Sequence, residues 1–129
     1  MTGSAAIDTN AYAALTHGDE AATDLIASFD PLFMPVVVLG ELLYGAGASG
    51  RSAENRQNLA DFVAECSILD ITPGVAEQYA LLRVQLRAVG RPIPDNDAWI
   101  AATCLAAGIP LITRDAHFAH VPDLEVVSW

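Results

Sequence analysis

Lysine is absent from this chain: all six basic residues among its 129 are arginines. A P-loop NTPase, a Schiff-base enzyme and a protein kinase each need a lysine in a defined role, so these three classes are excluded. Two cysteines, Cys66 and Cys104, are too few for a disulfide scaffold or a zinc cage. Cys104 lies in an alanine-rich run, where we expect it to pack as a small hydrophobe.

Long apolar runs and a targeting segment are missing as well. The most apolar stretch, residues 98–112, is interrupted by Thr103, Gly108 and Pro110 and is too short to span a bilayer. The first residues contain neither a basic segment nor a long apolar one, so we expect no signal peptide. We therefore expect a cytoplasmic protein without a membrane segment.

The composition favours one folded domain over residues 1–129. Apolar residues make up 53% of the chain and charged residues only 17%, which suits a sizeable core and argues against disorder. Sixteen acidic residues against six arginines give a net charge of −10. That balance is unusual for a protein that binds nucleic acid, and it favours a basic protein partner.

Short apolar runs that end in a polar residue alternate with longer amphipathic segments. We expect strands at residues 5–7, 32–36, 67–71, 109–113 and 125–128, and helices at 10–17, 20–29, 38–44, 53–65, 73–89 and 97–107. Gly45, Gly47 and Gly50 are expected to end the third helix, and Asp95 or Asn96 to cap the last one. The alternation predicts an α/β domain with a mainly parallel sheet.

Four acidic residues stand out, and one of them, Glu41, stands where a solvated surface would not place an acid. Asp8 and Asp115 come just after predicted strands, where open α/β sheets bind ligands. Asp97 lies at the start of a predicted helix, and Glu41 lies inside an apolar run. If the four converge, their repulsion calls for a cation, and Mg²⁺ or Mn²⁺ prefers carboxylate oxygens. The lack of histidine and cysteine at these positions argues against zinc, and the chemistry that fits is metal-assisted phosphodiester hydrolysis.

Each acid also has an ordinary structural interpretation. Asp8 suits a helix N-cap, and Asp97 suits the positive end of a helix dipole. Asp115 suits a turn, and Glu41 suits a pair with a buried arginine. The residues alone leave these interpretations open.

Four stretches of the chain resemble the PIN-domain ribonucleases of the VapC toxin family, over essentially its full length. They are IDTN at 7–10, VLGELLYGA at 38–46, RPIPDNDAWIAA at 91–102 and LITRDAHF at 111–118. The family's four acids fall on Asp8, Glu41, Asp97 and Asp115, which the resemblance implies are the catalytic, metal-binding residues. It implies a three-layer fold with a central parallel sheet of four to five strands.

The same resemblance implies an activity and partners. The protein would be a Mg²⁺-dependent endoribonuclease, with Mn²⁺ as a substitute, and the toxin of a type II toxin–antitoxin system. A VapB-type antitoxin would inhibit it, and we expect an arginine of that antitoxin to enter the acidic pocket. The family also implies a homodimer.

Residues beside the acids carry further expectations. Asn10 and Thr113 are expected to orient carboxylates or waters, with plain capping or turn roles as the alternative. Asp95 either reaches a metal through water or caps a helix. We expect Trp99 and Phe118 to be core residues, and His117 and His120 to be surface histidines in a turn.

The arginines are the candidates for RNA binding. Arg83, Arg87 and Arg91 are spaced by four residues, and Arg114 adjoins an acid. We expect Arg87, Arg91 and Arg114 to bind RNA phosphates, because a guanidinium donates two hydrogen bonds at once. Surface ion pairs are the alternative for all six arginines, and they are what we expect of the remaining two, Arg51 and Arg56.

Three other functions are compatible with parts of this pattern. The first is a non-catalytic PIN-like module that binds a metal or a protein, and the second is a PIN nuclease of RNA processing with no toxin role. The third, a phosphatase with Asp8 as nucleophile, fares badly because position 10 is Asn10 and the chain has no lysine.

Overall fold

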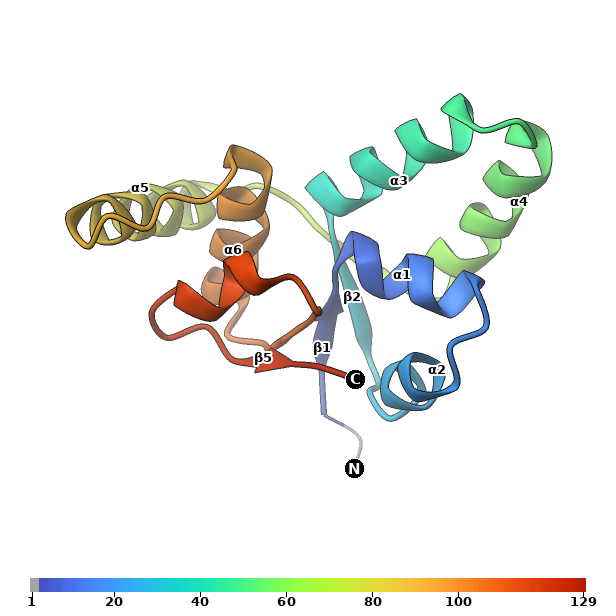
Figure 1. Cartoon of the computed structure of the whole chain (residues 1–129), viewed down its shortest axis with the longest axis horizontal. Helices are drawn as coiled ribbons and strands as arrows, with labels where there is room; N and C mark the ends of the chain where they lie inside the picture. Colours follow the sequence, from blue (N-terminus) through green and yellow to red (C-terminus); the bar gives the residue numbers. More distant parts are fainter. Residues whose placement is uncertain (1–2) are drawn as a thin grey trace.

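A five-stranded sheet runs through the middle of the computed structural model, which describes residues 3–129 (Figure 1). Its strands are β1 (Ala5–Ile7), β2 (Leu32–Pro35), β3 (Ser67–Leu69), β4 (Leu111–Ile112) and β5 (Val126–Val127). They lie in the order β3-β2-β1-β4-β5, and all four pairings are parallel. The predicted α/β class is therefore confirmed, and the sheet is wholly parallel. Met1 and Thr2, at the start of the segment screened for a signal peptide, lie outside the described residues.

Helices cover the sheet on two sides and make three layers (Figure 1). They are α1 (Thr9–Thr16), α2 (Glu20–Ala27), α3 (Val36–Ala48), α4 (Ser52–Val63), α5 (Pro73–Ala88), α6 (Asp95–Ala107) and the short 3₁₀ helix η1 (Ala116–His120). In Figure 1, α1 to α4 lie on one side of the sheet and α5 and α6 on the other. None of these helices, within residues 3–129, has the length and apolar character needed to cross a bilayer.

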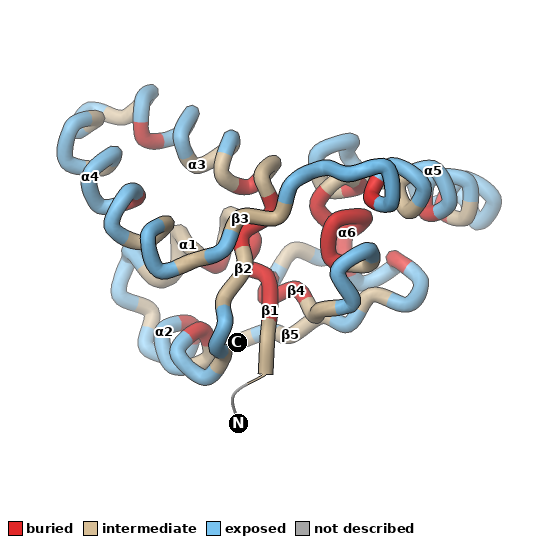
Figure 2. The backbone as a smooth tube through the Cα atoms, turned by 180° about the vertical axis from the view of Figure 1, so that it is seen from behind, coloured by how far each residue is buried: buried red, intermediate tan, exposed pale blue. Residues whose placement is uncertain are grey.

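The core follows the central strand and α6 (Figure 2). All three residues of β1 are fully buried, because helices cover both of its faces, and this explains an apolar run without alternation. Cys104 on α6 is also fully buried, and burial raises the pKa of its thiol to about 12. Phe118 is buried in this core and Trp99 packs against it, as expected.

Helix α3 is longer than its glycines suggest. It runs through Gly45 and Gly47 to Ala48, so the expectation that glycines end it is wrong. A glycine within a helix costs only about 1 kcal/mol, which packing against α4 offsets. The Arg56 guanidinium on α4 lies 3.0 Å from where a Cβ of Gly47 would stand. A larger side chain at position 47 would have to displace that guanidinium.

Arg51 and Arg56, the two arginines expected to form surface ion pairs, differ in their contacts. Arg51 pairs with Glu54 at 3.7 Å, as expected. Arg56 packs over Gly47 and forms no ion pair with another residue of the described chain, so the expected pairing is wrong for it. Its position depends on the contact between α3 and α4, which local sequence does not reveal.

Candidate functional site

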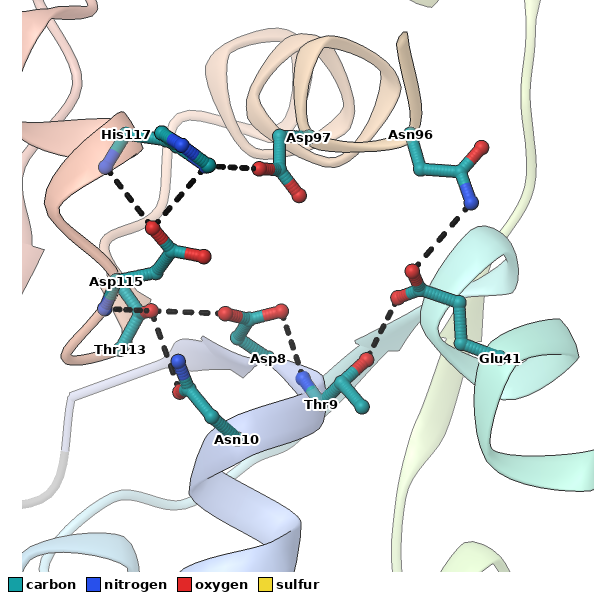
Figure 3. A network of polar contacts seen from close by, with 9 residues as sticks. All are labelled: Asp8, Thr9, Asn10, Glu41, Asn96, Asp97, Thr113, Asp115 and His117. Carbon is teal, nitrogen blue, oxygen red and sulfur yellow. Dashed lines mark hydrogen bonds and ion pairs between the residues drawn. The ribbon is translucent and has the colours of Figure 1, made fainter. Parts of the chain in front are cut away.

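The four acids meet at the carboxyl end of the sheet. Asp8 follows β1 directly, Glu41 lies on α3 just after β2, and Asp115 lies shortly after β4. Because β2, β1 and β4 are neighbours in the sheet, residues after their carboxyl ends come together. Asp97, from the first turn of α6, closes the ring. Figure 3 shows the four carboxylates around one space, so the structure brings all four together.

Asp8 is the most buried of the four, with 5% of its surface exposed. One carboxylate oxygen accepts the amide proton of Thr9 (2.7 Å), so Asp8 does cap α1. Burial raises the pKa of Asp8 to about 6, the charges of Asp97 and Glu41 add to that rise, and the hydrogen bonds oppose it. The cap therefore does not explain the residue, because an ordinary N-cap does not need to be buried beside other acids.

Thr113 connects two of the acids. Its fully buried hydroxyl donates to the second oxygen of Asp8 (2.8 Å) and accepts the amide proton of Asp115 (3.0 Å). The side-chain oxygen of Asn10 lies 3.3 Å from the same hydroxyl and 3.5 Å from the amide nitrogen of Arg114. These contacts hold the loop after β4 against the start of α1. Thr113 and Asn10 thus lie where they can orient Asp8.

Glu41 has no arginine partner within residues 3–129, so the interpretation as a buried ion pair is wrong. The Thr9 hydroxyl donates to one of its oxygens (2.6 Å), and the Asn96 side chain donates to the other (3.4 Å). Glu41 is only half-buried because α3 lies partly open to solvent. Tyr44, one turn further along α3, is 79% exposed. Sequence analysis singled out neither Thr9 nor Asn96 as a partner of this acid.

His117 is a surface histidine in a turn, as expected, but its contact with two of the acids is not predicted by the sequence. The side chain is exposed, yet its Nδ1 lies 2.8 Å from Asp97 and 3.2 Å from Asp115. The hydrogen bond to Asp97 and the charge of Asp115 raise the pKa of His117. Burial raises the pKa of Asp97, and the hydrogen bond from His117 opposes that rise. The sequence offers one signal for this contact: His117 lies two residues after Asp115, in the turn that follows a strand.

Asp95 does not cap α6, contrary to one of its two expected roles. It is the first residue of the helix, its side chain is 70% exposed, and it pairs with Arg83. Neither Asp95 nor Asn96 makes a side-chain cap bond. The reason is that Pro94 holds the N-cap position, so the helix starts earlier than the sequence suggests.

The three candidate RNA-binding arginines have different surroundings. Arg87 lines a hollow of about 310 Å³ together with Arg83, Val84, Leu86, Pro92 and Ile93. Arg91 lies with its Nη1 3.3 Å from Nε2 of His120. Arg114 donates from Nε to the Trp129 carbonyl (2.7 Å), and its guanidinium carbon lies 5.0 Å from the centroid of that ring. In the described chain, none of the three forms an ion pair with the four acids.

The donor set fits a divalent cation. Four carboxylates face one space, and His117 is the one basic side chain of residues 3–129 that pairs with any of them. Carboxylates so close together repel one another, and the raised pKa of Asp8 reflects part of this repulsion. Oxygen donors of this kind suit Mg²⁺ or Mn²⁺.

A groove of about 550 Å³ is lined by residues of α1, α3 and α4, including Thr9, Tyr12, Glu41, Leu42 and Leu59. Its lining combines apolar side chains with the carboxylate of Glu41, which also belongs to the ring of acids. Such a mixed lining suits an amphipathic segment of another protein.

Comparison with known proteins identifies the family. The PIN domain family matches residues 5–124. Ribonuclease VapC4 of Mycobacterium tuberculosis is 42% identical over 95 residues, covering 72% of this chain and 73% of that protein. Ribonuclease VapC2 of Rickettsia felis is 30% identical over 128 residues, covering 95% and 96%. The structure of VapBC2 from Rickettsia felis, bound to a DNA fragment from its promoter, has a TM-score of 0.88 at 25% identity and 98% coverage of both chains. The chain belongs to the PIN domain family, among its VapC proteins.

Proposed function

We propose that this protein is a Mg²⁺-dependent endoribonuclease, with Mn²⁺ as a substitute. The observation that carries the proposal is the convergence of Asp8, Glu41, Asp97 and Asp115 without a neutralising arginine in the described chain. The names of the relatives, which are ribonucleases, support the same activity. The alternative is a non-catalytic module that binds a metal or a protein and keeps its acids for folding alone.

The four acids would hold the cation at the carboxyl end of the sheet. When bound, Mg²⁺ activates water and stabilises the charge that develops on the phosphate and the leaving oxygen. Thr113 and Asn10 keep Asp8 oriented, and Thr9 and Asn96 do the same for Glu41. Asp95 is occupied by Arg83, so we do not include it in the metal site.

The test is cleavage of total cellular RNA by the purified protein. With Mg²⁺ or Mn²⁺ we expect discrete fragments, because positioned carboxylates and a cation act on a defined substrate geometry. With EDTA the fragments should disappear and should return when Mg²⁺ is added in excess. Intact RNA with either metal, for protein shown by mass spectrometry to be free of other chains, would reject the nuclease and favour the binding module.

We also propose that the protein is a toxin of a type II system, held inactive by a VapB-type antitoxin in the cytoplasm. The VapBC complex among the related structures supports this role over RNA processing. The net charge of −10 and the groove lined in part by Glu41 suit a basic segment. We expect an antitoxin arginine to reach the carboxylates. Complex formation should weaken at high salt and when that arginine becomes glutamate, and an affinity indifferent to both changes would contradict the idea.

Arg87, Arg91 and Arg114 are proposed to contact RNA phosphates. Replacing each by alanine should weaken RNA binding and lower the salt dependence by about one unit in the slope of log K against log salt. Fluorescence anisotropy with an RNA oligonucleotide measures both the affinity and its salt dependence. The variants are made in an Asp97→Asn background, which prevents cleavage. Arg51→Ala is the control, because Arg51 is paired with Glu54 on α4. Equal slopes for all four variants would mean that the three arginines serve only the fold.

A homodimer is the last part of the proposal. Leu43 and Tyr44 on α3 and Leu81 and Val84 on α5 are between 50% and 79% exposed. Exposed apolar side chains such as these are typical of an interface between copies. Light scattering after size exclusion should give twice the mass of the 13.6 kDa chain. A mass of one chain at micromolar concentration would contradict the dimer.

A further inference from the structure

His117 lies between two of the proposed metal-binding acids. Its Nδ1 faces Oδ2 of Asp97 at 2.8 Å and Oδ1 of Asp115 at 3.2 Å. One donor atom from each of these three residues lies within 4.8 Å of the other two. Figure 3 shows the imidazole and both carboxylates at the same end of the ring of acids, away from Glu41.

The local backbone holds this trio in place. The amide of His117 donates to the same Asp115 oxygen (3.0 Å), and this bond caps η1. Asp115 is in turn tied to Thr113 through its own amide. Asp97 comes from the first turn of α6, which is packed into the core. The imidazole is therefore presented to the two acids by a fixed turn.

An imidazole changes which metal such a site prefers. Mg²⁺ takes oxygen ligands and retains waters, whereas Mn²⁺ and Zn²⁺ accept carboxylate and imidazole together. No histidine occupies the four acidic positions in the sequence, but the fold brings His117 beside two of them, so zinc is no longer disfavoured there. The Asp8 and Glu41 end of the ring offers oxygen donors.

The geometry points to His117 as a metal ligand that makes the Asp97–Asp115 end of the site prefer divalent transition ions, Mn²⁺ and Zn²⁺, over Mg²⁺. This inference rests on the proposed metal-binding role of the acids. In the structure as it stands, Nδ1 lies within 3.2 Å of an oxygen of both carboxylates. With a cation bound, the lone pair of Nδ1 would join the oxygens as a ligand, and a proton on that nitrogen would be released to solvent.

Electron spin echo spectroscopy of the Mn²⁺-loaded protein tests this directly, because it detects a ¹⁴N nucleus bound to the ion. The wild-type spectrum should contain an imidazole nitrogen coupling. His117→Gln should lose it, while His120→Gln, at the exposed end of η1, should keep it. Circular dichroism establishes that each variant is folded, and His117→Asn serves as a second variant if the glutamine fails to fold.

Metal titration by calorimetry gives the second readout. His117→Gln should weaken Mn²⁺ and Zn²⁺ binding about tenfold or more and change Mg²⁺ binding by less than about threefold. Mn²⁺ that binds without nitrogen coupling, or equal losses for all three ions, would overturn the inference and leave the proposed nuclease standing. Failure of the wild type to bind Mn²⁺ or Mg²⁺ at all would overturn the proposed function itself.

Discussion

Asp97→Asn protein is expected to cleave RNA at least about a thousandfold more slowly than the wild type, because it loses a charged metal ligand at the reacting centre. Asparagine has nearly the same shape as aspartate, so the change removes a charge without emptying space. Asp97 also faces Asp115 and His117, and its loss therefore disturbs one end of the ring of acids. The rate is measured from initial cleavage of a labelled RNA at saturating Mg²⁺.

The matched control is Asp24→Asn. Asp24 is exposed on α2, and Asp24→Asn makes the same chemical change outside the network of contacts around the four acids. This control should cleave at the wild-type rate. If both variants were equally active, Asp97 would have no part in the reaction, and its place at the start of α6 would be explained by the helix dipole alone.

Asp8→Asn protein is expected to be more stable than the wild type at pH 7 in the absence of metal. Burial raises the pKa of Asp8 from 3.8 to about 6, so the folded protein holds an ionised carboxyl in an unfavourable place. That difference corresponds to about 3 kcal/mol at most. Asparagine avoids this cost but fits the Thr9 and Thr113 hydrogen bonds less well, so we expect a gain of between about 1 and 3 kcal/mol.

The free energy of unfolding of the wild type should decrease as the pH rises through the titration range of Asp8. Between pH 4 and pH 6 the folded state binds more protons at Asp8 than the unfolded state does, so the wild type loses stability as the pH rises through this range. Asparagine does not titrate, and the stability advantage of Asp8→Asn should fall by about 1 kcal/mol between pH 7 and pH 5. Urea unfolding in EDTA at pH 7 and pH 5 measures the stability difference between Asp8→Asn and the wild type, with Asp24→Asn as the control.

The opposite result would change the functional interpretation. If Asp8→Asn were less stable than the wild type at pH 7, Asp8 would serve the fold, as in a binding module that keeps its acids for structure. A gain in stability combined with a loss of cleavage would instead mark a residue that costs stability in exchange for activity. The two measurements together separate a structural acid from a functional one.

The sequence by itself determined the strands, the parallel sheet and the positions of the acids. The run at Ala5–Ile7 has no polar alternation because helices cover both faces of β1, and this pattern can be recognised locally. Asp8 and Asp115 follow strands that a parallel sheet must bring to one edge, and Glu41 is marked by its place inside an apolar run. Local patterns of this kind therefore predict the fold and indicate that a site lies at the carboxyl end of the sheet.

The tertiary structure alone decided how the acids are partnered. Glu41 is bound by Thr9 and Asn96, which are 32 and 55 residues away, and His117 reaches Asp97 across 20 residues. Periodicity and capping rules describe neighbours along the chain, whereas these contacts depend on how α1, α3, α6 and η1 pack. The same holds for the burial that raises the pKa of Asp8, because elements distant in sequence surround that residue and exclude water from it.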